Sequence, residues 1–124
     1  MGRDFRKIIA WQKADDLTVE IYHLTKNFPK EELYGLTSQI RRASVSVPAN
    51  IAEGSTRNHQ KEYLQFLFIA KSSLAEVEYY LHLAKRLGYI DKSYKKCVEL
   101  QQETAKVLHG LITFIRQEVL SLGS

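Results

Sequence analysis

Apolar side chains recur every three to four residues along most of this chain, which is the spacing of one face of an α-helix. The pattern breaks near Pro29, over residues 54–56 and at Gly88. Between these breaks it predicts helices over residues 10–27, 36–53 and 58–87. A fourth helix, capped by Asp91, is expected to end near residue 120.

Each predicted helix carries an apolar face that needs neighbours to cover it. On the first helix this face consists of Ala14, Leu17, Ile21, Leu24 and Phe28. Because the connections between helices are short, consecutive helices are expected to lie side by side and point in opposite directions. The predicted fold is therefore all-α, an antiparallel up-down-up-down four-helix bundle that forms a single domain over residues 1–124.

The second helix is unusual because it contains Pro48 and is apolar over much of its circumference. Proline cannot donate a backbone hydrogen bond to Ser44, so we expect the helix to bend there. One face consists of Ile40, Ala43, Ser44, Val47 and Ile51, with Val45, Pro48 and Ala52 beside it. A helix of this kind has more than one surface to bury.

Apolar positions also exceed what one bundle core needs. We expect the surplus to form an oligomer interface made of Val45, Ala52, Phe68, Ile69, Tyr79 and Leu83. A further strip at seven-residue spacing, Leu100, Val107 and Phe114, is predicted on the side of the fourth helix. Exposed together, such strips would exceed the apolar patches that soluble monomers usually tolerate. A homo-oligomer is therefore predicted, with a single wider core as the alternative.

Composition is typical of a globular protein, with 124 residues, 44% of them hydrophobic and 26% charged. No segment has the length and apolar character of a signal peptide or a membrane span, so we expect a cytoplasmic protein with no membrane partner. The formal net charge is +4, from 18 basic and 14 acidic side chains. These charges are spread evenly over the two halves of the chain, so no basic tail is evident.

Few residues are spaced for catalysis or metal binding. Glu20 and His23 have the spacing of one half of a di-iron motif, but Ile21 occupies the core position and no second pair exists. Neither a nucleophile elbow nor a glycine-rich phosphate loop is present. The single cysteine, Cys97, is expected to be a small buried side chain. We therefore predict a protein that is not an enzyme and has no cofactor, metal or small-molecule substrate.

The polar residues of the second helix and its exit offer two interpretations. Gln39, Ser46, Asn50 and Glu53 are predicted to form a structural polar network, with Asn50 and Glu53 buried beside the proline bend. Four basic residues around the same helix, Arg41, Arg42, Arg57 and Lys61, are the candidates for RNA binding. Mixed donors and acceptors favour the network, because Glu53 would repel phosphate.

The motif formed by Gln39, Arg41, Arg42, Ala43, Ser46, Asn50, Ile51, Ala52, Glu53, Gly54 and Arg57 resembles a family of small four-helix-bundle proteins. Members are encoded in intervening sequences of bacterial 23S rRNA genes. The likeness continues in residues 11–14, 21–22, 28–29, 34–37 and 87–90, so it covers nearly the whole chain. It implies a four-helix fold and a homo-oligomer, as members are known as pentamers, but no established activity.

Two function classes remain open from the sequence. The first is a non-enzymatic oligomer that binds RNA or a nucleoprotein weakly and with little sequence preference. The basic charge supports it, as does the resemblance, because a related accessory protein of diversity-generating retroelements works with nucleic acid and a polymerase. The alternative is a self-assembling structural protein with a protein partner and no nucleic-acid binding. Salt-dependent RNA binding separates the two classes.

Overall fold

The computed structural model describes residues 3–122, which form four long helices and no strand. The helices are α1 (Ile9–Thr25), α2 (Leu36–Ser55), α3 (Gln60–Arg86) and α4 (Tyr94–Leu122), with short 3-10 turns η1 (Phe5–Lys7) and η2 (Lys30–Glu32). All four predicted helices are present, close to their predicted bounds. Within the described part of the chain, no helix is long and apolar enough to cross a membrane.

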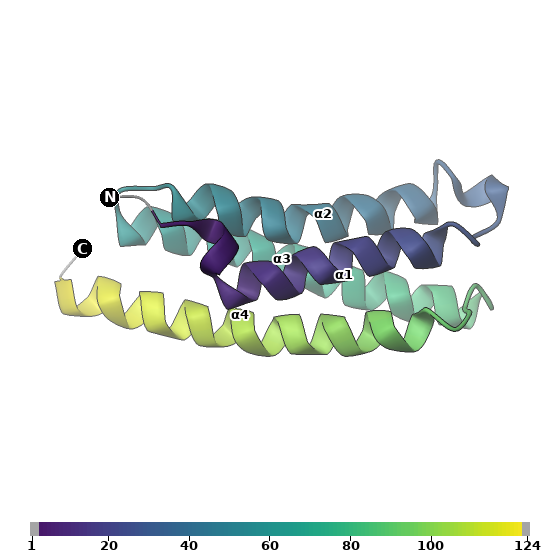
Figure 1. The fold of residues 1–124 in the computed structure, drawn as a ribbon. Helices are drawn as coiled ribbons and strands as arrows, with labels where there is room; N and C mark the ends of the chain where they lie inside the picture. Colours follow the sequence, from purple (N-terminus) through teal and green to yellow (C-terminus); the bar gives the residue numbers. More distant parts are fainter. Residues whose placement is uncertain (1–2, 123–124) are drawn as a thin grey trace.

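The helices pack lengthwise as a bundle in which α1 contacts α2 and α4, and α3 contacts the same two helices (Figure 1). Two polar contacts show that the chain runs in opposite directions through α1 and α4, because the later residue of the first segment meets the earlier residue of the second. Lys13 Nζ lies 2.9 Å from Glu103 Oε1, and Asn27 Nδ2 lies 2.7 Å from Asp91 Oδ2. The connection between α1 and α2 therefore lies beside the connection between α3 and α4 (Figure 1).

The core matches the inward faces expected from the sequence. All five predicted core residues of the first helix are buried, and Cys97 is completely buried. Burial, with smaller effects from Glu20 and Asp91, raises the pKa of the Cys97 thiol to about 12. The strip predicted on the side of α4 is divided: Leu100 is buried and Val107 is partly buried against the core, whereas Phe114 is exposed.

The proline inside α2 leaves a backbone carbonyl that a neighbouring helix satisfies. Pro48 has no N–H to donate to the carbonyl of Ser44, four residues earlier. The hydroxyl of Thr18 on α1 donates to that carbonyl at 2.8 Å. Both Pro48 and Ser44 are buried, so an unpaired carbonyl there would be costly. This contact fixes the position of α1 along α2.

Gly54 does not end α2, although the sequence predicted a break there. The helix continues through it to Ser55. A Cβ atom at this glycine would lie 2.6 Å from Cβ of Phe66 and 3.0 Å from Cδ1 of Tyr63, both on α3. The glycine is needed for the close approach of two helices. Gly88, in contrast, follows α3 with φ of +79°, which agrees with its predicted role as a helix stop.

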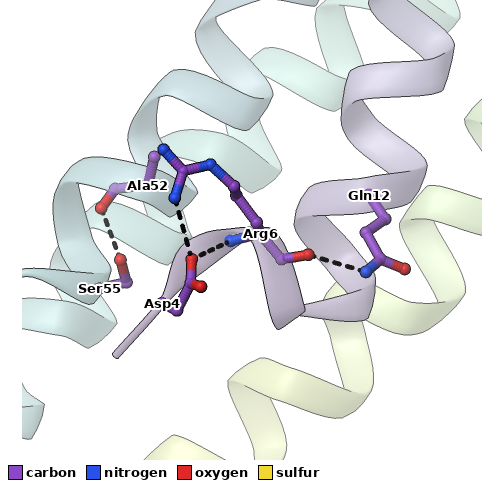
Figure 2. A network of polar contacts seen from close by, with 5 residues as sticks. All are labelled: Asp4, Arg6, Gln12, Ala52 and Ser55. Carbon is purple, nitrogen blue, oxygen red and sulfur yellow. Dashed lines mark hydrogen bonds and ion pairs between the residues drawn. The ribbon is translucent and has the colours of Figure 1, made fainter. Parts of the chain in front are cut away.

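The segment before α1 covers the end of α2. Figure 2 shows the Arg6 backbone N–H donating to Asp4 Oδ1 (3.1 Å), and Gln12 Nε2 donating to the Arg6 carbonyl (2.8 Å). Arg3 then reaches the last turn of α2, where its Nη1 donates to the carbonyl of Ser55 at 3.0 Å. Carbonyls at a helix end have no partner within the helix, so Arg3 stabilises this terminus.

We predict that Gly54→Ala lowers the free energy of unfolding by about 1–3 kcal/mol, because the added methyl group overpacks the contact with α3. Gly110→Ala on α4 is the matched control, since a Cβ there meets nothing within 4 Å. Replacing a glycine by alanine inside a helix should stabilise by roughly 0.5–1 kcal/mol. Chemical denaturation of both variants measures the difference, and equal effects would refute the close-approach role of Gly54.

Candidate nucleic-acid interface

The four basic residues predicted to bind RNA do not form one patch. Arg41 and Arg57 are sixteen positions apart, which corresponds to about 24 Å along a helix. Arg42 is exposed and lines a small polar hollow between α2 and α3, and Lys61 is exposed at the start of α3. The structure therefore separates the residues that the sequence places around one helix.

Two of these arginines are held by other side chains. Arg41 Nε donates to the hydroxyl of Thr25 at 2.8 Å, and its guanidinium lies 4.6 Å from the centre of the Tyr22 ring. Arg57 lies over Phe66 at 4.7 Å, with Nη2 3.7 Å from a carboxylate oxygen of Glu53. Its buried Nε has no hydrogen-bond partner within residues 3–122. These contacts give both arginines a packing role.

The polar network predicted on α2 is present in part. Asn50 Nδ2 donates to the Ser46 carbonyl at 2.8 Å and to the Ser46 hydroxyl at 3.0 Å. The hydroxyl of Ser73 on α3 donates to the same Ser46 oxygen at 2.8 Å. The network therefore joins α2 to α3, with one member that the sequence did not indicate.

Two residues assigned to that network lie outside it in the single chain. Gln39 is exposed, and the side chain of Glu53 is 57% exposed and pairs with Arg57. The prediction that Asn50 and Glu53 are buried was therefore wrong for Glu53 in the single chain, and Asn50 is only partly buried. Glu53 lies near the end of α2, beyond the Ser46–Ser73 contact, where solvent and Arg57 satisfy its charge.

The residues predicted for an oligomer interface differ in exposure. Val45, Ile69 and Tyr79 are exposed large apolar side chains. Ala52, Phe68 and Leu83 are only partly exposed, and the latter two pack against the core of the same chain. The Arg116 guanidinium also lies 5.4 Å from the centre of the Phe68 ring. Only part of the predicted set is thus available to another molecule.

A concentration of positive charge lies where the two connections meet. Asn27 and Asp91 join these connections by a hydrogen bond, and the Tyr89 hydroxyl donates to Glu32 Oε2 at 3.0 Å. Seven exposed basic side chains belong to this part of the bundle: Lys26, Lys30, Lys85, Arg86, Lys92, Lys95 and Lys96. We call this set the basic end.

Few carboxylates oppose the basic end, and two of them are already engaged. Its acidic residues are Glu31, Glu32 and Asp91, with Glu99 one turn beyond Lys95 on α4. Glu32 accepts from the Leu36 N–H and from Tyr89. Hydrogen bonds from Asn27 and Ser93 lower the pKa of Asp91. Among the described residues, no side chain of the basic end lies within 4.0 Å of a carboxylate.

Helix stability does not account for all of these charges. Lys85 and Arg86 lie in the last turn of α3, where the helix dipole favours cations. Lys95 and Lys96 lie in the first turn of α4, where the dipole disfavours cations and no acidic residue is present. Charges placed against a local preference are expected at functional sites.

Counting charges along the sequence could not reveal the basic end. Its members come from two connections more than fifty residues apart, and each is a short group of lysines and arginines flanked by acidic residues. Only packing of the helices brings the two groups to one end of the bundle. The sequence does contain one indication of the basic end. Short connections between antiparallel helices imply that the first and the third connection lie at the same end of the bundle.

Comparison with known proteins identifies a family and similar solved structures. The family described as 23S rRNA-intervening sequence protein matches residues 6–110, which include the whole basic end. A similar crystal structure is a protein of unknown function from the S23 ribosomal protein family of Bacteroides thetaiotaomicron. It is 27% identical, covers 84% of this chain and 98% of its own, and has a TM-score of 0.76. No curated protein matches the chain.

We predict that Asn50→Ala and Ser73→Ala are coupled, because both side chains bond the hydroxyl of Ser46. A double-mutant cycle should give an interaction of about 0.5 kcal/mol or more, whereas Glu53→Ala and Ser73→Ala should be additive. The higher helix propensity of alanine changes the stability of the single and the double variants alike, so it cancels in the cycle. Thermal or chemical unfolding of the six proteins measures these terms, and additivity in the first pair would exclude a shared network.

Proposed function

Because this chain belongs to the family of 23S rRNA-intervening sequence proteins, we propose that it is a homo-oligomeric RNA-binding protein with no catalytic activity. The basic end is the observation that carries this proposal. It presents seven exposed cations without ion pairs among residues 3–122, opposed by four carboxylates. Nucleic acid is the partner whose charge such a surface fits.

The chemistry of the basic end supports contact with phosphates rather than with bases. Lysine predominates there, and a lysine ammonium is a compact charge on a flexible stem with no fixed hydrogen-bonding geometry. Such side chains neutralise phosphates but do not distinguish one base from another. We therefore expect weak binding with little sequence preference.

Self-assembly would multiply this charge. Val45, Ile69 and Tyr79 expose 41%, 48% and 55% of their surface and supply apolar area for contact with a second copy. In a cyclic oligomer whose bundles run along the rotation axis, every subunit presents the same end to the same side, so the basic ends would form one surface. A pentamer would carry a formal charge of +20. Such a surface raises the local concentration of a polyanion.

A second candidate function is assembly with a protein partner and no nucleic acid. The observation in its favour is the far end of α4, where Phe114, Leu120 and Leu122 are all more than half exposed. The C-terminal end of α4 lies at the opposite end of the bundle from the two connections that carry the basic end (Figure 1). An apolar surface there suits a protein partner rather than RNA.

We predict that the protein in solution has a mass several times the 14.3 kDa of one chain. Size exclusion with light scattering at micromolar concentration measures it. Ile69→Glu should reduce that mass, because a charge in an apolar contact is costly, whereas Gln102→Glu on exposed α4 should leave it unchanged. Phe68 is unsuitable for this test because it packs against the core. A wild-type monomer would contradict the proposal.

We predict that RNA binding is electrostatic and depends on the basic end. The affinity for a labelled single-stranded RNA should fall steeply between about 50 and 200 mM salt, by a log-log slope of roughly 0.7 per phosphate neutralised. Lys92→Gln with Lys95→Gln should reduce that slope by about 1.4. Fluorescence anisotropy across a salt series measures both quantities.

Lys7→Gln with Lys106→Gln is the matched control, because it removes the same charge from exposed lysines outside the basic end. It should change the slope much less. An equal effect of the two double variants would show that net charge, not the basic end, governs binding. Absence of binding at about 50 mM salt by an assembled wild-type protein would favour the protein-partner function.

A further inference from the structure

A cavity of about 330 Å³ opens within the basic end, between the end of α1, η2 and the start of α2. Its lining includes three cations, Lys26, Lys30 and Arg41, and no carboxylate. The remaining lining is largely apolar, with Phe28 and Leu33 among its side chains. Three like charges converging on one cavity repel one another unless an anion neutralises them.

Arg41 is already oriented for such an anion. Thr25 occupies its Nε, and Tyr22 lies under its guanidinium plane at 4.6 Å. These two contacts hold the group at the cavity while its terminal nitrogens remain as donors. Holding a guanidinium in place before binding lowers the entropy lost when the ligand arrives.

Thr37 contributes a hydroxyl to the lining of the same cavity, although the residue as a whole is only 4% exposed. Thr37 is also the second residue of α2, where backbone N–H groups lack acceptors within the helix and favour negative charge.

The two acidic side chains of η2 do not line the cavity. Glu32, just before α2, accepts from the Leu36 N–H and from the Tyr89 hydroxyl. Glu31 is exposed and does not line the cavity. The cavity therefore combines three cations, the Thr37 hydroxyl and a helix start, which together match the charge and the acceptor oxygens of phosphate.

We propose that this cavity is a phosphate-binding site, in which Lys26, Lys30 and Arg41 neutralise one phosphate group and the Thr37 hydroxyl donates to it. The apolar wall leaves room for the adjoining sugar of a nucleotide. The proposal identifies phosphate as the group that the basic end recognises, so it rests on the proposed RNA binding. Free phosphate, a nucleoside monophosphate and an RNA phosphate share this chemistry.

The test titrates inorganic phosphate, adenosine monophosphate and single-stranded RNA separately into ¹⁵N-labelled full-length protein at constant ionic strength. The expected result is a saturable shift of the Thr37 and Ser38 amide signals with every probe. Thr37→Val, which keeps the shape and removes the hydroxyl, should weaken phosphate binding about tenfold. Thr37→Ser should retain binding and shows whether loss in the valine variant comes from the hydroxyl or from misfolding.

Lys92→Gln with Lys95→Gln is the matched control at the basic end, because neither lysine lines the cavity. It should weaken RNA binding while leaving the affinity for inorganic phosphate unchanged. RNA binding without any shift at Thr37 would overturn the phosphate site and leave the proposed function intact. Phosphate binding that Thr37→Val weakens, in a protein that binds no RNA, would establish the site and refute the function. Equal phosphate affinity of the valine variant and the wild type would overturn the site.

Discussion

The position of α2 between α1 and α3 is the constraint on which the remaining structure depends. Its internal proline frees the carbonyl of Ser44, and the Thr18 hydroxyl on α1 donates to that carbonyl. On the other side, Ser46 accepts from Ser73, and Gly54 lets α3 approach closely. Because these contacts lie at different points along the helix, they determine how far α1 and α3 can slide against it.

This alignment of the helices places the two connections side by side. Once α1 and α3 are aligned on α2, the ends of both helices lie at the same end of the bundle, where Asn27 bonds Asp91. Lysines from both connections then share one surface, with few carboxylates to oppose them. The charge of the basic end is therefore a consequence of packing, and it costs the fold little because its side chains remain hydrated.

The arginines show why the number of basic residues is a poor guide to a binding surface. Arg3, Arg41 and Arg57 each lie over an aromatic ring, at 4.4, 4.6 and 4.7 Å. An arginine stem covers apolar surface while its planar head stacks and donates hydrogen bonds. Arg57 makes such contacts at the end of α2, where it stacks on Phe66 and pairs with Glu53. Arg41 differs, because it also lines a cavity whose wall includes two lysines.

The sequence by itself determined the four helices, the inward face of α1 and the stop at Gly88, because periodicity and backbone preference are local properties. For the polar residues and the glycine of α2, only the tertiary structure decided whether they contact solvent or a neighbouring helix. It exposed Glu53, made Gly54 a packing contact and added Ser73 to the polar network. It also brought Thr37 and Arg41 to one cavity with Lys30. These outcomes depend on distances between segments remote in the chain, which a pattern along one helix does not contain.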